Sequence, residues 1–154
     1  GFDTFNCVEH RIEYFAQYKG IKCYNDSKAT NVDSTVTALK ALQSANRIWL
    51  ILGGRDKGAP YKPLLPFLNN FCKHAVLIGE ASPLIKQALA GRFPATEKGD
   101  LKSAVEYILS SAQAGDIMLL SPACASFDQF KDFEDRGKQF KQIVADYIKA
   151  RKEG

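Results

Sequence analysis

Three short polar segments of this chain carry side chains that could bind an anionic ligand. The first, residues 25–31 (NDSKATN), places a carboxylate, an ammonium, hydroxyls and amides directly before apolar residues at helical spacing. The second, residues 53–58 (GGRDKG), and the third, residues 121–130 (SPACASFDQF), each follow an apolar run of strand length. The amino end of a helix has unpaired N–H groups and a partial positive charge, so the first segment suits an anion.

Plainer interpretations of these segments stay open at this point. Asp26, Ser27 and Asn31 could only cap the helix, with Lys28 in solvent. The paired glycines of the second segment could only form a tight turn. This segment is neither a dinucleotide-binding nor a phosphate-binding loop, because Gly-Lys-Ser/Thr occurs nowhere in the chain. Likewise, His10 could be a surface or hinge histidine.

Composition excludes several classes of function. The chain has 154 residues, 45% of them hydrophobic, which predicts one globular domain. The formal net charge of +4 is spread along the chain without a basic stripe, so nucleic acid is not expected as a partner. No apolar run approaches the roughly 20 residues that cross a membrane, and the start does not resemble a secretory signal. Because the chain begins at Gly1 and not at Met, we expect a piece of a longer protein.

The cysteines, Cys7, Cys23, Cys72 and Cys124, lie far apart and show no metal-binding spacing. We therefore expect neither a zinc site nor a disulfide framework, and predict reduced, mostly buried thiols. Cys124 lies in the third polar segment, but no histidine accompanies it there. We interpret it as a small packing residue, not a nucleophile.

Periodicity predicts elements that alternate along the chain. The predicted strands cover residues 12–18, 21–24, 47–52, 75–78 and 117–120, with a further brief strand beginning near Phe93. The predicted helices cover residues 32–42, 63–71, 82–89, 100–112 and 130–148. On the last helix, Phe130, Phe133 and Phe140 should face the core, with Lys131 and Arg136 pointing elsewhere.

This order predicts a Rossmann-like α/β fold over residues 1–154, in which about six mostly parallel strands carry helices on both faces. The first two strands form a hairpin, which places an antiparallel strand at one edge. All three polar segments then meet at the carboxyl ends of the strands, where ligands bind in such folds. Lys28, Thr30, Lys57 and Ser126 would surround several anionic oxygens there. A phosphate and a small dicarboxylate both fit that description.

The polar segments together resemble the carboxy-terminal domain of the Mur ligases. The resemblance is carried by residues 10–13 (HRIE), 25–31 (NDSKATN) and 53–58 (GGRDKG). Residues 121–126 (SPACAS), 128–130 (DQF), 133–134 (FE) and 136–137 (RG) resemble the D-glutamate-adding branch of that family. The resemblance extends from about His10 to the last helix, which is almost the whole chain.

The resemblance implies a ligase of peptidoglycan synthesis in the bacterial cytoplasm. ATP would phosphorylate the carboxylate of UDP-N-acetylmuramoyl-L-alanine, and the amine of D-glutamate would attack the acyl phosphate. By this resemblance, the residues that hold D-glutamate are Thr30, Lys57, Ser126, Phe127 and Phe133. Those on the ATP side are His10, Arg11, Asn25, Asp26, Lys28, Lys131 and Arg136. Asp26 and Lys28 would also be catalytic, because an ammonium offsets charge on the transferred phosphate.

One departure from the family pattern concerns activity. The family's first domain holds the UDP-sugar, and its central domain carries the phosphate loop and the Mg²⁺ ligands; this sequence contains neither. We therefore expect a single amino-acid-binding domain that works with its own two other domains, is monomeric, has no metal ligand of its own and is inactive alone. The alternatives are the equivalent domain of another Mur or folylpolyglutamate-type ligase, and a free-standing module that binds an anionic amino acid or nucleotide.

Overall fold

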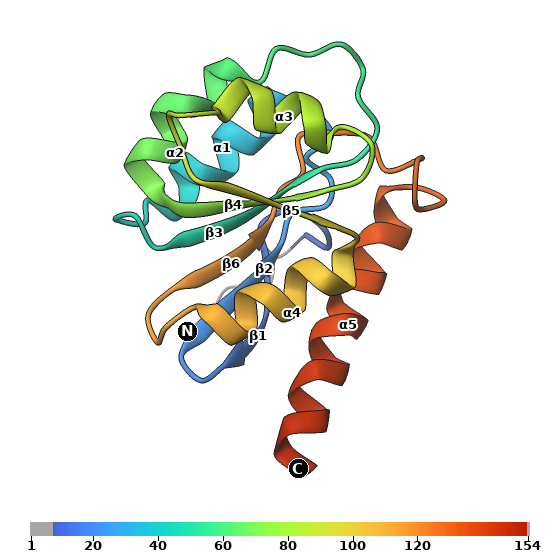
Figure 1. Cartoon of the computed structure of the whole chain (residues 1–154). Helices are drawn as coiled ribbons and strands as arrows, with labels where there is room; N and C mark the ends of the chain where they lie inside the picture. The colour runs from blue at the N-terminus through green and yellow to red at the C-terminus, as the bar shows by residue number, and fades with distance from the viewer. Residues whose placement is uncertain (1–7, 154) are drawn as a thin grey trace.

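A six-stranded sheet runs through the middle of the molecule (Figure 1). The computed structural model describes residues 8–153, and the strands are β1 (Glu13–Tyr18), β2 (Ile21–Asn25), β3 (Ile48–Gly53), β4 (Cys72–Ile78), β5 (Ala95–Gly99) and β6 (Ile117–Leu120). Their order across the sheet is β1-β2-β6-β3-β4-β5. β1 is antiparallel to β2, and every other neighbouring pair is parallel. The predicted fold class is therefore confirmed.

Helices cover both faces of this sheet, as predicted (Figure 1). They are α1 (Val32–Leu42), α2 (Leu65–Phe71), α3 (Ser82–Leu89), α4 (Leu101–Ser111) and α5 (Phe133–Glu153), with a short 3₁₀ turn η2 (Lys62–Leu64) before α2. α1, α2 and α3 pack on one face, and α4 and α5 pack on the other.

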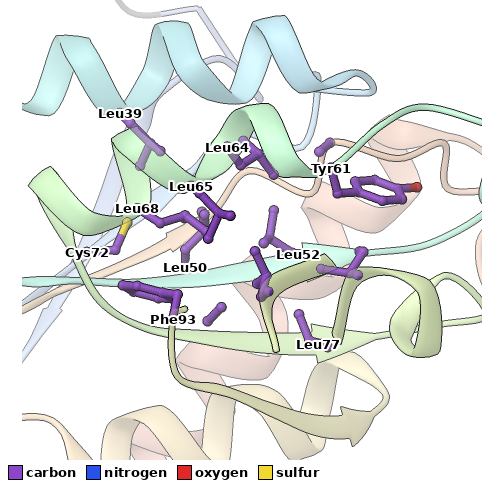
Figure 2. Packing of buried hydrophobic residues seen from close by; sticks show 14 of the residues in the cluster. Leu39, Leu50, Leu52, Tyr61, Leu64, Leu65, Leu68, Cys72, Leu77 and Phe93 are labelled. Carbon is purple, nitrogen blue, oxygen red and sulfur yellow. The ribbon is translucent and has the colours of Figure 1, made fainter. Parts of the chain in front are cut away.

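The central strand β3 is buried on both sides, which explains its uninterrupted apolar run. All of its residues are buried, and successive side chains point to opposite faces of the sheet. Leu50 and Leu52 pack with the side chains of α1, α2 and α3, a cluster that Figure 2 shows from close by. Trp49 and Ile51 pack with α4 and α5. The helices on the two faces are thus attached through alternate residues of one strand.

Some boundaries differ from the predicted ones. β5 begins at Ala95, because Phe93 is buried in the core beneath α3 before the strand starts. α5 begins at Phe133, because Asp132 caps it: Asp135 N donates to Asp132 Oδ1 at 2.7 Å. β4 starts earlier than predicted, and α5 continues beyond residue 148.

The described cysteines, Cys23, Cys72 and Cys124, are buried free thiols, and Cys7 lies outside the described residues. Burial raises the pKa of Cys23 to about 12. Between residues 8 and 153, none of the helices has both the length and the apolar character that crossing a bilayer requires.

The strand order decides how the three polar segments are arranged. The first follows β2, the second follows the end of β3, and the third follows β6. Because β6 lies between β2 and β3, the third segment lies between the other two at this edge. It is therefore the segment that can contact both.

Replacing Leu50 with Ala tests whether β3 is the centre of the core. Leu50 is fully buried, so we expect the free energy of unfolding to fall by about 3 kcal/mol. Urea denaturation of the chain, followed by circular dichroism, measures this. Lys102→Ala on the exposed surface of α4 is the matched control and should change stability by less than about 0.5 kcal/mol. A Leu50→Ala chain as stable as the wild type would contradict the assigned core.

Candidate functional site

The first polar segment is anchored by its backbone where it leaves the sheet. Asp26 N donates to Leu120 O at 2.7 Å, which extends the pairing of β2 with β6. Two residues later, Lys28 N donates to His10 O at 3.0 Å. The segment is thus fixed on both sides before α1 begins, so its side chains have defined positions.

A cavity of about 370 Å³ opens beside this segment at the amino end of α1. Its walls are formed by Arg11, Ile12, Asp26, Lys28, Ala29, Thr30, Asn31, Ser34 and Thr37. Two exposed cations, one buried carboxylate and several hydroxyls therefore surround one space. This composition fits a ligand with several anionic oxygens.

Asp26 is the carboxylate of this cavity and is 4% exposed. Its Oδ1 accepts a hydrogen bond from Ile12 N at 3.0 Å, and its Oδ2 accepts one from Ser121 Oγ at 2.6 Å. Burial raises the pKa of Asp26 to about 6, although the two hydrogen bonds and the Arg11 cation act to lower it. Both carboxylate oxygens are thus already bonded to the protein.

Helix capping explains only one residue of the first segment. Asn31 Oδ1 accepts a hydrogen bond from Ser34 N at 2.8 Å and caps α1. Ser27 Oγ donates instead to Phe133 O at 2.6 Å, and Asp26 turns away from the helix. The capping interpretation is therefore right for Asn31 and wrong for Asp26 and Ser27.

Arg136, in the first turn of α5, points into the protein. The prediction that it would point away from the buried side is wrong, because Arg136 is 0% exposed. Its Nε and Nη2 donate to Ser27 Oγ and Ser27 O at 2.9 and 2.7 Å, and its Nη1 donates to Cys124 O at 3.0 Å. Burial lowers its pKa to about 10. Arg136 thus connects the first polar segment to the third.

His10 is also buried, at 4% exposure, so the alternative of a surface histidine is wrong. Asn25 Nδ2 donates to His10 Nδ1 at 2.9 Å and to Glu13 Oε1 at 3.0 Å. The ring packs on α5 at Gly137, where a Cβ would overlap the imidazole. Residue 137 must therefore be glycine for helix and histidine to approach this closely.

Glu9, His10 and Glu13 lie close enough together to offer ligand atoms to one metal ion. Lys141 of α5 already lies between the two carboxylates, with Nζ 2.8 Å from Glu9 Oε2 and 3.1 Å from Glu13 Oε2. Because this ammonium offsets part of their charge, we interpret the cluster as an ion-pair network that attaches α5 to β1 and to the turn before it.

The second polar segment packs closely against backbone. Gly53 and Gly54 have φ angles of 126° and 139°, which favour glycine. A Cβ at Gly53 would overlap the carbonyl of Ile78, and one at Gly54 would overlap the carbonyl of Ala125. Arg55 N then donates to Ala125 O at 2.8 Å. The glycines thus allow the second segment to contact β4 and the third segment.

The residues expected to hold D-glutamate do not all lie around one cavity. Thr30 is part of the cavity wall described above. Lys57 is exposed, and Phe127 is 60% exposed. Ser126 is only 1% exposed, and Phe133 is half-buried. Apart from Thr30, these residues are not part of that wall within residues 8–153.

The residues expected on the ATP side fall into three groups. Those that line the cavity are Arg11, Asp26 and Lys28. Those that are buried and hydrogen-bonded within the protein are His10, Asn25 and Arg136. Lys131 is exposed and is not part of the cavity wall.

Three hydroxyl residues near the cavity were missed by the sequence reasoning. Ser34 and Thr37 are spaced i and i+3 on α1 and line the cavity. Helical spacing from Thr30 could have indicated them. Ser121, which donates to Asp26, follows the strand that ends at Leu120. Its position after a parallel strand was the available signal.

Comparisons with known proteins give one consistent family. The family described as Mur ligase, glutamate ligase domain, matches residues 10–124. The UDP-N-acetylmuramoylalanine--D-glutamate ligase of Elusimicrobium minutum is 54% identical over 142 residues, which cover 92% of this chain and 31% of the relative. The enzyme of the same name from Chlamydia caviae is 48% identical, over 93% of this chain and 34% of the relative. The chain thus spans about a third of the length of the relatives it matches.

Solved structures show the same fold at lower identity. A murein peptide ligase from Psychrobacter arcticus gives a TM-score of 0.65 at 15% identity, over 88% of this chain and 30% of that chain. The MurF ligase of Thermotoga maritima, solved in complex with ADP, gives 0.61 at 14% identity, over 91% of this chain and 32% of that chain. These similarities support the fold.

Asp26 should make the stability of the chain depend on pH. Its pKa rises from 3.8 to about 6 in the folded chain, so its stabilising contribution is full below the lower value and is lost as pH rises through the higher one. Asp26→Asn cannot titrate. The free energy of unfolding of the wild type, minus that of this variant, should therefore fall by on the order of 3 kcal/mol between about pH 3.5 and pH 7.

Urea unfolding at a series of pH values measures this difference. Asp33→Asn, which removes an exposed carboxylate from the first turn of α1, is the matched control. The unfolding free energy of the wild type minus that of the variant should fall with rising pH, and it should fall more for Asp26→Asn than for this control. A difference that does not change with pH would contradict the raised pKa.

Proposed function

This chain belongs to the family of the Mur ligase, glutamate ligase domain, and from that premise we propose that it is the carboxy-terminal domain of an ATP-dependent ligase that adds D-glutamate to UDP-N-acetylmuramoyl-L-alanine. The observation that carries the proposal is the 54% identity, across 92% of this chain, with a D-glutamate ligase. Because the chain spans about a third of such relatives, the complete reaction needs further segments.

In the proposed reaction, an amine is joined to an activated carboxylate. Transfer of a phosphoryl group from ATP to the L-alanyl carboxylate gives an acyl phosphate and ADP. The amine of D-glutamate then attacks the carbonyl carbon, the amide forms with loss of a proton, and inorganic phosphate leaves. Arg11 and Lys28 line the cavity at the amino end of α1, so their charges would stabilise the phosphoryl oxygens as negative charge develops on them.

D-glutamate would bind between the three polar segments. Thr30 supplies a hydroxyl at the cavity, and exposed Lys57 supplies an ammonium from the second segment. An ammonium and a hydroxyl suit a dicarboxylate. Ser126 is buried in the third segment, and the exposed ring of Phe127 stands beside it. We propose that Thr30 and Lys57 contact the same substrate molecule only in the complete enzyme.

Mg²⁺ does not fit the cavity of this domain. Asp26 is the carboxylate there, and both of its oxygens accept hydrogen bonds from the protein. Arg11 and Lys28 stand in the same wall, whereas magnesium takes several oxygen ligands. We therefore assign the ion and most of the ATP contacts to the rest of the enzyme, and this domain to the amino acid and the anionic oxygens.

The proposal also includes the partners and the location of the enzyme. The other two domains of the same chain would carry the UDP-sugar and ATP and would close over this domain, which excludes water from the acyl phosphate. We propose a monomer in the bacterial cytoplasm, where the nucleotide-linked precursor is made.

Variants of the full-length ligase test the two kinds of role. Lys57→Ala should raise KM for D-glutamate about 10- to 100-fold, because a charge-assisted hydrogen bond to a carboxylate is lost. Lys28→Ala should lower kcat about 100-fold or more, because its charge acts on the reacting phosphate. Steady-state release of phosphate, measured against each substrate in turn, separates these effects. Lys102→Ala, on α4, is the control. Wild-type kinetics for both Lys57→Ala and Lys28→Ala would contradict the proposed site.

The chain by itself should not ligate D-glutamate. It contains the cavity at α1 but spans about a third of its relatives. Incubation with ATP, Mg²⁺, UDP-N-acetylmuramoyl-L-alanine and D-glutamate, followed by mass spectrometry, should yield no amide product. The full-length ligase under the same conditions is the positive control. Product from the isolated chain would contradict the assignment of ATP activation to other domains.

A further inference from the structure

We propose that Tyr61 is a positioning residue for the amino-acid site, and that its hydroxyl holds Asp56, and with it Lys57, against the segment that carries Ser126. The inference deepens the proposed function and rests on it. Tyr61 itself lies in the core and would not touch the substrate.

Two polar contacts of one hydroxyl join the second polar segment to the third. Tyr61 OH donates to Asp56 Oδ1 at 2.7 Å and lies 3.4 Å from Cys124 Sγ. A phenol has a single hydrogen, and a carboxylate oxygen only accepts. The bond to Asp56 therefore uses that hydrogen, and the Cys124 thiol donates to the phenol oxygen.

Burial keeps these groups in the protonation states that the chain of bonds requires. Tyr61 is 5% exposed and Cys124 is 1% exposed. Burial raises the pKa of each group, so the phenol stays a donor and so does the thiol. The ring of Tyr61 packs in the core cluster with Leu52 and Leu64 (Figure 2). This packing fixes the position of the hydroxyl.

The loop that carries Lys57 has few other attachments. Arg55 N donates to Ala125 O at its start. Within residues 8–153, the next loop hydrogen bond between backbone groups is the one from Leu64 N to Tyr61 O. Residues 56–60 between these points form neither helix nor strand. The Tyr61–Asp56 bond is thus the attachment that immediately precedes Lys57.

The same hydroxyl therefore sets the distance between two proposed substrate contacts. Lys57 follows Asp56 directly, and Ser126 comes two residues after Cys124. Loss of the hydroxyl would free the Lys57 loop while the ring still fills its place in the core. Binding of the amino acid should weaken, and chemistry on the phosphate at α1 should continue.

Steady-state kinetics of the full-length ligase test this inference. Tyr61→Phe should raise KM for D-glutamate about 10-fold, because one hydrogen bond that orders the loop is lost. We expect kcat and KM for ATP to stay within about 3-fold of the wild type, and the thermal midpoint to change little. Asp56→Ala should reproduce the effect, and the double variant should be no worse than either single variant.

Asp56→Asn keeps an oxygen that accepts from Tyr61, so it should restore KM for D-glutamate to near the wild-type value. Tyr14→Phe removes a hydroxyl of the edge strand β1 that makes an exposed bond to Gln17, and it is the matched control. A Tyr61→Phe enzyme with wild-type KM for D-glutamate would overturn the inference, as would a uniform loss of stability and of affinity for all substrates. A wild-type enzyme without D-glutamate ligation would instead overturn the proposed function.

Discussion

The arrangement of the site depends on one buried guanidinium. Arg136 is fully enclosed, and its donors reach two carbonyls and one hydroxyl that belong to segments far apart in the sequence. Burial of a charge is costly unless hydrogen bonds compensate it. Here the carbonyls of Ser27 and Cys124 supply that compensation. If the guanidinium were absent, both carbonyls would lose their partner in a dry environment, and the distance between the first and third polar segments would no longer be fixed.

The sheet supplies the other constraint. Parallel strands bring their carboxyl ends to one edge, and the insertion of β6 between β2 and β3 puts the third polar segment in the centre. From there it bonds to the first segment through Ser121 and Asp26, and to the second through Ala125 and Arg55. α5 follows this segment and returns along the sheet, which allows Arg136 to reach back into it. The third segment is thus last of the three along the chain but central in space, and this central position allows it to bond to the other two.

Much of this fold could be predicted from local patterns. β3, β6 and residues 75–78 of β4 are apolar runs of strand length, which are typical of strands covered on both faces. Asn31 and Asp100 both accept from the backbone at helix starts. Strand order could not be read in the same way, because it is decided by contacts between distant segments. At the site, exposed Lys28 and buried Asp26 could be expected at the cavity from their place before a helix.

The side chains that hold the segments together were harder to predict. Arg136 belongs to a helix of mostly polar character, and its burial depends on acceptors up to 109 residues away. Tyr61 follows a glycine- and proline-containing loop and carries no local signal that its hydroxyl meets Asp56 and Cys124. Periodicity reports which face of an element is apolar, but it does not report which carbonyls remain without a donor.

The contact of His10 with Gly137 has a consequence for how such a sequence can change. A side chain at residue 137 would overlap the imidazole, and a smaller residue in place of His10 would take away an acceptor of Asn25. The three positions lie in the turn before β1, at the end of β2 and in α5, yet none can be replaced alone without loss. A change at one of these positions should therefore need a compensating change at another, so we expect alignments of relatives to show the three positions varying together or not at all.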